Sequence, residues 1–280
     1  MSSVIVRTAG LVFRYPDGRP ALNGVDIEIH RGEVVAIVGQ NGSGKTTLAK
    51  HFNGLLRATE GVVEIGGVRV EKQSTVELSR TIGYCYQNPD HQIFAPTVRD
   101  EIRFGPVHLG LDAQEVQERT ERILALVGLL DQQDEYPFNL GRGQRQLLAV
   151  ASVLALMPEV LIVDEPTTGL DWRGSEAMMA LVHQLHDQGT TVIAITHDMN
   201  LVAKHAERMI VMAQGDLVAD GAPREVFARP DVLDRAMLRA PQAHRMTSRL
   251  PGLFPVPALS AAEACASLGA TDGARQEEGV

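Results

Sequence analysis

The sequence has little cysteine, few aromatic residues and no excess of basic charge. Its two cysteines, Cys85 and Cys265, lie far apart, without the paired spacing of a metal site or a disulfide framework. We therefore expect two reduced thiols in a cytosolic protein. The 280 residues include 35 acidic and 26 basic side chains, giving a formal net charge of -9. This balance does not favour a basic nucleic-acid-binding face, and we expect no nucleic-acid partner.

Long hydrophobic runs are also missing. The longest runs from Leu147 to Met157 and is interrupted by Ser152, whereas a membrane-spanning helix needs roughly 20 apolar residues. The first residues, MSSVIVRTAGLVF, lack the charged start and long apolar stretch of a secretory signal. We expect a chain that does not cross a membrane, so that any membrane role would require a partner.

What the sequence does contain is an α/β pattern. Short β-rich segments at Val4–Arg7 and Leu11–Tyr15, and the alternating segment Val25–Ile29, predict strands. The apolar run Val34–Val38 predicts a central strand, and Gly66-Gly67 predicts the turn of a hairpin. Further strands are predicted at the segments Val160–Val163, Thr191–Ile195, Met209–Met212 and Leu217–Ala219.

Helical patterns lie between these strands. Residues 89–158 are predicted to form a largely helical subdomain, in which Asp112 caps one helix and Gly128 ends it. After about Leu238 the composition shifts to Pro and Ala, so we place a domain at residues 1–238 and a C-terminal extension at 239–280. Ser260 and Glu263 predict one short capped helix in the extension, and the last ten residues are expected to be disordered.

The segment GQNGSGKT, Gly39 to Thr46, matches the phosphate-loop pattern G-x-x-x-x-G-K-[ST] and follows a predicted strand. Glycines there allow backbone N–H groups to surround phosphates, a lysine reaches the outer phosphates, and the hydroxyl of Thr46 binds Mg²⁺. The predicted ATP-binding residues of this region are Gly39, Gln40, Asn41, Gly42, Ser43, Gly44, Lys45, Thr46 and Thr47.

A pair of acids, Asp164 and Glu165, follows the apolar strand VLIV. An isolated acidic pair is usually only a solvated strand end, but here it occurs in a chain that already has a phosphate loop. We expect Asp164 to hold Mg²⁺ and Glu165 to polarise the attacking water.

Two other polar residues follow apolar strands. Gln87 is a candidate Mg²⁺ ligand and His197 a candidate catalytic residue, because open α/β sheets bind ligands at the carboxyl ends of their strands. Tyr15, 30 residues before Lys45, is a candidate for stacking on adenine. An exposed strand aromatic and a structural histidine are the alternatives.

Together these features resemble the ABC-type ATPase family over residues 4–238. The resemblance adds a signature-like loop, LGRGQ, at Leu140, Gly141, Arg142, Gly143 and Gln144, and a D-loop ending at Asp171. It implies a RecA-like P-loop core, an antiparallel β subdomain, an inserted helical subdomain, and head-to-tail dimers holding two ATP molecules.

A narrower resemblance concerns LAKHFNGLL and the segment from Gln87 to Leu111, which are similar to the ATPases of energy-coupling factor importers. Those importers bring vitamins or transition-metal ions into prokaryotic cells. The resemblance implies a peripheral position on the cytoplasmic face of the cell membrane, with a transmembrane coupling subunit and a substrate-binding membrane subunit as partners. Asp100, Glu101 and Arg103 are the candidate contacts, with a solvated helix face as the alternative. The tail favours the cobalt or nickel type.

The signature loop departs from the family's usual Leu-Ser-Gly-Gly-Gln. Gly141 removes a hydroxyl whose hydrogen bond to a charged group contributes roughly 1.5–3 kcal/mol, and Arg142 adds a guanidinium that either approaches the phosphate or points to solvent. We expect an altered but active site, acting on the partner's ATP in a homodimer or in a pair with a paralogous ATPase. A Gly141→Ser, Arg142→Gly variant is expected to change ATP turnover without abolishing it.

Two other functions remain open from sequence alone. One is a soluble ABC ATPase acting on translation or DNA repair, although the second cassette or long coiled-coil insertion of such proteins is not seen. The other is a P-loop kinase or unrelated NTPase, which leaves the signature-like loop, Gln87 and His197 unexplained.

Overall fold

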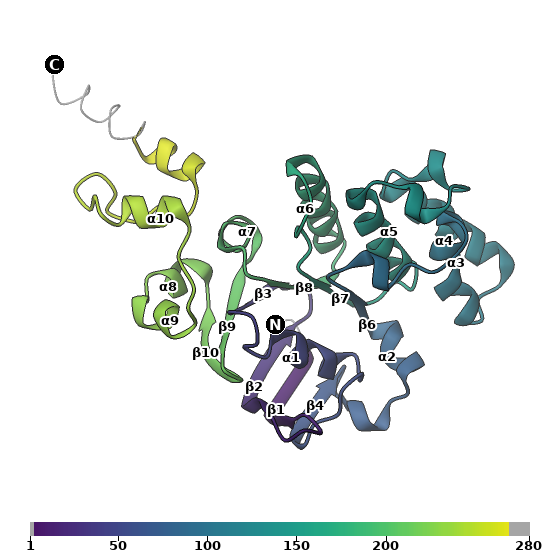
Figure 1. Ribbon diagram of the computed structural model, residues 1–280, viewed down its shortest axis with the longest axis horizontal. Coiled ribbons are helices and arrows are strands. Elements are labelled where there is room, and N and C mark those ends of the chain that lie inside the picture. Colours follow the sequence, from purple (N-terminus) through teal and green to yellow (C-terminus); the bar gives the residue numbers. More distant parts are fainter. Residues whose placement is uncertain (1–2, 269–280) are drawn as a thin grey trace.

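The computed structural model describes residues 3–268, which form two β-sheets surrounded by helices (Figure 1). The strands are β1 (Val4–Arg14), β2 (Pro20–His30), β3 (Val34–Val38), β4 (Glu60–Ile65), β5 (Val68–Arg69), β6 (Ile82–Cys85), β7 (Val160–Asp164), β8 (Thr191–Thr196), β9 (Arg208–Ala213) and β10 (Asp216–Gly221). The α-helices are α1 (Lys45–Phe52), α2 (Thr75–Thr81), α3 (Val98–His108), α4 (Ala113–Leu126), α5 (Arg142–Leu154), α6 (Trp172–Asp187), α7 (Met199–His205), α8 (Pro223–Phe227), α9 (Pro230–Arg235) and α10 (Gln242–Thr247).

The larger sheet has six strands in the order β10-β9-β3-β8-β7-β6. All of its pairings are parallel except the hairpin β9–β10. Strands β3, β7 and β8 are buried at every residue, as expected for parallel strands covered on both faces. The carboxyl ends of β3, β6, β7 and β8 therefore lie along one edge of the sheet.

The smaller sheet is antiparallel, in the order β2-β1-β4-β5. The sequence predicted two strands where the structure has the single strand β1. Gly10 interrupts the pattern, but it adopts a φ of 57°, and the register shifts between Thr8 and Leu11, so a bulge lets the strand continue. Helix α1 packs between the two sheets within one shared apolar cluster.

Helices α3, α4 and α5 form the inserted unit near the β6 end of the large sheet, and α8 to α10 lie near its β10 end (Figure 1). The predicted cap is confirmed, because the Asp112 carboxylate accepts a hydrogen bond from the Glu115 N–H at 2.9 Å. Helix α4 ends at Leu126, and Gly128 follows with a φ of 68°. The stripe of α6, from Met178 to Leu185, faces the core as expected.

The C-terminal helices are attached to the domain by their own apolar cluster, in which Phe227, Leu233 and Ala240 are buried with residues of β9. The predicted capping of a last helix is confirmed, because Ser260 Oγ accepts a hydrogen bond from the Glu263 N–H, and residues 261–268 are helical. The expectation of disorder in the last ten residues lies outside the described residues. No helix among residues 3–268 has both the length and the hydrophobicity that a membrane span needs.

Candidate active site

The predicted site residues converge at one edge of the six-stranded sheet. Gly39 follows β3, Gln87 lies just beyond β6, Glu165 follows β7 and His197 follows β8. Because these strands are parallel neighbours, their carboxyl ends lie together, as the sequence predicted.

The phosphate loop, Gly39–Thr46, has a tightly constrained backbone. A Cβ on Gly39 would lie 2.2 Å from the Met212 carbonyl oxygen, so only glycine fits there. The Ser43 hydroxyl is buried and has no hydrogen-bond partner among the described residues. Lys45 Nζ donates to the carbonyl oxygens of Gly39 at 2.8 Å and Gln40 at 2.9 Å. The lysine is thus held inside the loop where it can bind an anion.

The charge of Lys45 is balanced by its surroundings. Burial lowers its pKa, while the nearby carboxylates of Glu165 and Asp164 act in the opposite direction. A buried ammonium with incomplete hydrogen bonding gains from a strongly anionic ligand. The loop therefore fits the phosphates of a nucleotide.

Two residues with side-chain oxygens suited to binding Mg²⁺ lie beside the loop. Thr46 Oγ1 donates to Asp164 Oδ2 at 3.0 Å, and the Tyr84 hydroxyl donates to the same oxygen at 2.9 Å. Burial raises the pKa of Asp164, and the hydrogen bonds from Tyr84 and Thr46 oppose that rise. Hydroxyl and carboxylate oxygens are the ligands that Mg²⁺ prefers, so this pair fits the ion.

The contact from Tyr84 was missed by the sequence reasoning. Burial, followed by the Asp164 charge, raises the pKa of Tyr84, so its hydroxyl stays protonated and donates. The sequence did contain a sign of this contact. Tyr84 lies within the short strand that leads to Gln87, and a buried tyrosine hydroxyl needs a hydrogen-bond partner.

Glu165 and His197 form a close pair. His197 Nδ1 lies 2.6 Å from Glu165 Oε1, and the Thr168 hydroxyl donates to Glu165 Oε2 at 3.0 Å. Glu165 has a φ of 52°, in the left-handed region that non-glycine residues rarely adopt. Its carboxylate is thus fixed by two partners on a strained backbone, a feature that clusters at functional sites.

A cavity of about 290 Å³ joins these groups to Tyr15. It is lined by ten of the predicted site residues, namely Tyr15, Asn41, Gly42, Gly44, Lys45, Thr46, Thr47, Gln87, Asp164 and Glu165. The Tyr15 hydroxyl lies 2.9 Å from Thr47 Oγ1, and the Arg19 guanidinium lies 5.7 Å from the centre of the Tyr15 ring. Arg19, which was not among the predicted site residues, also lines the cavity.

The signature loop, Leu140–Gln144, does not line this cavity. Gly141 caps helix α5, and its N–H donates to Gln144 Oε1 at 3.3 Å. Arg142 is an exposed residue, and its expected approach to the phosphate of a partner's ATP stays a prediction. Its guanidinium donates to the Thr168 carbonyl at 3.4 Å and packs against Gly169, where a Cβ would lie 2.6 Å from Arg142 Cζ.

The D-loop residue Asp171 serves as a helix cap. Its Oδ1 accepts a hydrogen bond from the Gly174 N–H at 2.7 Å, at the start of α6. Arg142 contacts the residues just before Asp171, so the signature loop and the D-loop are in contact within one chain.

Of the three residues predicted to contact the membrane partner, the structure contradicts Glu101. Its side chain is buried, with 2% of the residue exposed, and Oε2 accepts hydrogen bonds from the N–H groups of Phe94 and Ala95. Glu101 therefore supports the segment after Gln87 from inside. Asp100 and Arg103 are partly exposed, and Asp100 Oδ1 lies 3.6 Å from Arg103 Nη1.

Comparison with known proteins places this site in a family. Residues 22–168 match the family model described as ABC transporter. The chain is 44% identical over 240 residues to the energy-coupling factor transporter ATP-binding protein EcfA of Methanocaldococcus jannaschii, covering 85% of this chain and 86% of that protein.

Solved structures show the same fold. The structure of cbiO1 from Clostridium perfringens, part of the ABC transporter complex cbiONQ, gives a TM-score of 0.76 at 33% identity, covering 90% of this chain and 99% of that one. A dimeric ATP-binding cassette in a post-hydrolysis state with ADP and Pi gives a TM-score of 0.71 at 28% identity, covering 79% and 99%.

Proposed function

The chain belongs to the ABC transporter family of ATPases, and we propose that it is the ATP-hydrolysing subunit of an importer of the energy-coupling factor type. The 44% identity to EcfA across 240 residues carries this proposal. The site supports it, because Lys45, Thr46, Asp164, Glu165 and His197 are brought to one edge of the sheet.

The proposed chemistry is hydrolysis of the terminal phosphate of ATP. Lys45 binds the outer phosphates together with the backbone N–H groups of its loop, and Tyr15 supports the base. Thr46, Asp164 and Gln87 would hold Mg²⁺, which would supply positive charge to the phosphates. Glu165 accepts a proton from the attacking water, and His197 fixes the orientation of the Glu165 carboxylate.

We propose that two copies, or this chain and a paralogous ATPase, close head to tail around two ATP molecules. In that arrangement the signature loop of one subunit would complete the site of the other. The Arg142–Gly169 contact supports this coupling, since it joins the loop to the D-loop that follows Glu165. A nucleotide-bound crystal structure with the site held within a single subunit would refute the arrangement.

Closure would be transmitted to a transmembrane coupling subunit and, through it, to a substrate-binding membrane subunit. We place the chain as a peripheral protein on the cytoplasmic face of the prokaryotic cell membrane. Asp100 and Arg103 are the proposed contact, on the exposed face of α3. The test is purification of the full chain from native membranes, followed by mass spectrometry. Recovery of hydrophobic membrane subunits supports import, whereas recovery of ribosomes or DNA favours the alternative of a soluble ABC ATPase.

For the cargo we favour a transition-metal ion, cobalt or nickel, over a vitamin. The similarity to cbiO1 of Clostridium perfringens over 90% of this chain supports this choice, because the match extends into the C-terminal extension. Uptake of labelled Co²⁺ and Ni²⁺ is compared in cells carrying the wild type and Glu165→Gln. Loss of Co²⁺ or Ni²⁺ uptake in the Glu165→Gln cells supports the metal cargo. If vitamin uptake is lost in these cells and metal uptake is unchanged, the metal cargo is refuted.

A further inference from the structure

A second cleft adjoins the catalytic pair, outside the nucleotide cavity. Its volume is about 720 Å³, and it shares Asn41 and Glu165 with that cavity. On one side it is lined by the phosphate loop and His197, and on the other by Arg239 and Arg245 of the C-terminal segment. The cleft therefore begins where the terminal phosphate of a bound nucleotide would end.

The acids of this cleft already have partners. Glu165 is held by His197 and Thr168. Asp198 Oδ1 accepts hydrogen bonds from the N–H groups of Asn200 and Leu201 at the start of α7. These carboxylates thus have hydrogen-bond partners of their own, and neither is bonded to an arginine of the cleft.

The two arginines, in contrast, are unpaired. Both are exposed, and neither side chain makes a hydrogen bond or an ion pair within the described residues 3–268. A pair of free guanidinium groups beside a catalytic carboxylate is suited to an oxyanion, because each can donate two hydrogen bonds to neighbouring oxygens.

The backbone that carries them is fixed. Met237 turns the chain after α9 with a φ of 50°, a rare conformation for a non-glycine residue. Leu238 N–H donates to the Leu233 carbonyl at 2.8 Å, and Ala240 and Pro241 are buried. The Arg245 N–H donates to the Pro241 carbonyl at 3.0 Å. The fold therefore fixes the backbone positions of both arginines, which line the cleft.

We propose that this cleft binds the orthophosphate that leaves the catalytic site after ATP hydrolysis, with Arg239 and Arg245 as its ligands. The C-terminal extension thereby contributes directly to product release. This inference depends on ATP hydrolysis and not on import, so it fails or stands independently of the membrane partner.

The test measures binding of inorganic phosphate to the full chain by ³¹P NMR titration, with saturating MgADP occupying the phosphate loop. Removing both charges in an Arg239→Ala, Arg245→Ala variant is expected to weaken phosphate binding about tenfold, because charge-assisted hydrogen bonds are lost at an exposed site. Arg239→Lys, Arg245→Lys keeps the charges and is expected to retain affinity within about threefold.

The matched control is Arg80→Ala, Arg249→Ala, which removes two other exposed arginines, neither of which lines the cleft. It is expected to bind phosphate as the wild type does. Equal affinities in the cleft and control variants would overturn the proposal. So would unchanged phosphate affinity combined with weaker ATP-induced dimerisation, which would assign the arginines to a second copy of the chain. ADP affinity confirms that each variant is folded.

Discussion

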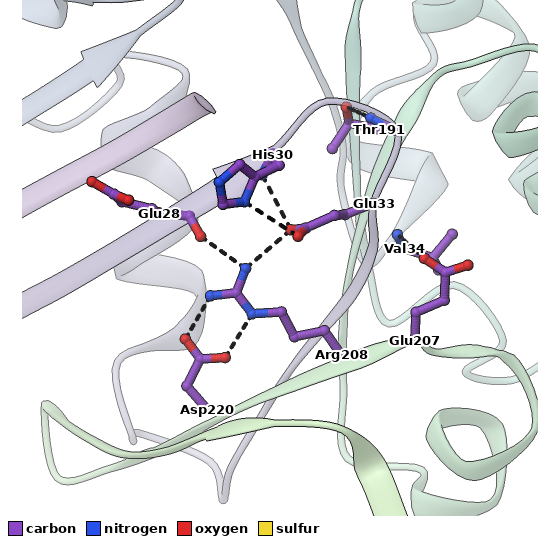
Figure 2. Close-up of polar contacts among 9 residues, drawn as sticks. Glu28, His30, Glu33, Val34, Thr191, Glu207, Arg208 and Asp220 are labelled. Carbon is purple, nitrogen blue, oxygen red and sulfur yellow. Dashed lines mark hydrogen bonds and ion pairs between the residues drawn. The ribbon is translucent and has the colours of Figure 1, made fainter. Parts of the chain in front are cut away.

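The two edges of the six-stranded sheet differ in how completely their polar groups are paired. At the amino edge, where β3, β8 and β9 begin, Arg208 makes a double hydrogen bond with Asp220, at 2.6 and 2.7 Å, and a third with Glu33 at 3.0 Å (Figure 2). Its Nη1 also donates to the Glu28 carbonyl at 2.8 Å. Hydrogen bonds to Asp220 lead the causes that raise the pKa of Arg208, so its charge is fully matched.

The carboxyl edge has the opposite character. Ser43 is buried without a partner, Lys45 is held by backbone carbonyls, and Arg239 and Arg245 are unpaired in the described chain. The backbone at Glu165 is strained. The paired charges around Arg208 contribute stability, whereas unpaired charges at the carboxyl edge stay available for a ligand. We therefore expect substitutions at the carboxyl edge to change catalysis, and those at the amino edge to change stability.

The largest effect should come from Glu165→Gln at the carboxyl edge. Loss of the proton acceptor is expected to lower ATP turnover at least about 100-fold while ATP binding persists, so that an ATP-bound dimer accumulates. Phosphate release and size-exclusion chromatography measure the two effects. Turnover at the wild-type rate would remove Glu165 from the base role.

At the amino edge, Arg208→Met should lower the free energy of unfolding by about 2 kcal/mol, because Asp220 and Glu33 lose their partner in a partly buried setting. Urea unfolding measures the change, with Arg208→Lys as the control that keeps the charge but loses the double hydrogen bond. The turnover of the folded fraction should remain unchanged. A large fall in turnover without a stability loss would contradict the division between the two edges.

Tyr84→Phe tests whether Mg²⁺ binding needs the hydrogen bond from the Tyr84 hydroxyl to the Asp164 carboxylate. We expect the Mg²⁺ concentration for half-maximal ATPase to rise about tenfold, because an oriented carboxylate holds the ion better. ATP binding without Mg²⁺, followed by fluorescence, should be unchanged. An unaltered Mg²⁺ requirement would show that Tyr84 serves only packing.

The smallest effect concerns His205, whose Nδ1 lies 2.7 Å from His183 Nε2 on α6. Burial, with His183 and Lys204, lowers the pKa of His205 to about 4, while Glu176 and Asp198 act in the opposite direction. A lowered pKa means that the folded state excludes the proton, so stability is complete above about pH 6.5 and declines as the pH falls towards 4.

Because His205 is only half-buried, solvent screening limits this decline to less than about 1 kcal/mol. His205→Asn should flatten the change in the free energy of unfolding between pH 7 and pH 5. Urea unfolding at the two pH values measures it, and an identical pH dependence in both proteins would exclude the histidine pair as its source.

Much of this architecture was predictable because it depends on local patterns. Periodicity located the buried strands, and Gly39–Thr46 has a backbone requirement that few other sequences meet. The convergence of Gln87, Asp164, Glu165 and His197 also followed from sequence, because each residue comes directly after a strand that reads as buried. What failed were details of side-chain direction. Glu101 looked like a surface acid but is buried, and the contact of Arg142 with Thr168 and Gly169 was not foreseen.

By itself, the sequence determined which strands form, where the phosphate loop lies and which residues stand at the strand ends, since these follow from apolar spacing and from glycine. The tertiary structure alone decided that Tyr84 reaches Asp164, that Arg142 packs against Gly169, and that Arg239 and Arg245 line the same cleft as Glu165 and His197. Those contacts join residues separated by 26 or more positions, or bring the tail back to the sheet. Only the packing of strands and helices in three dimensions fixes such distances.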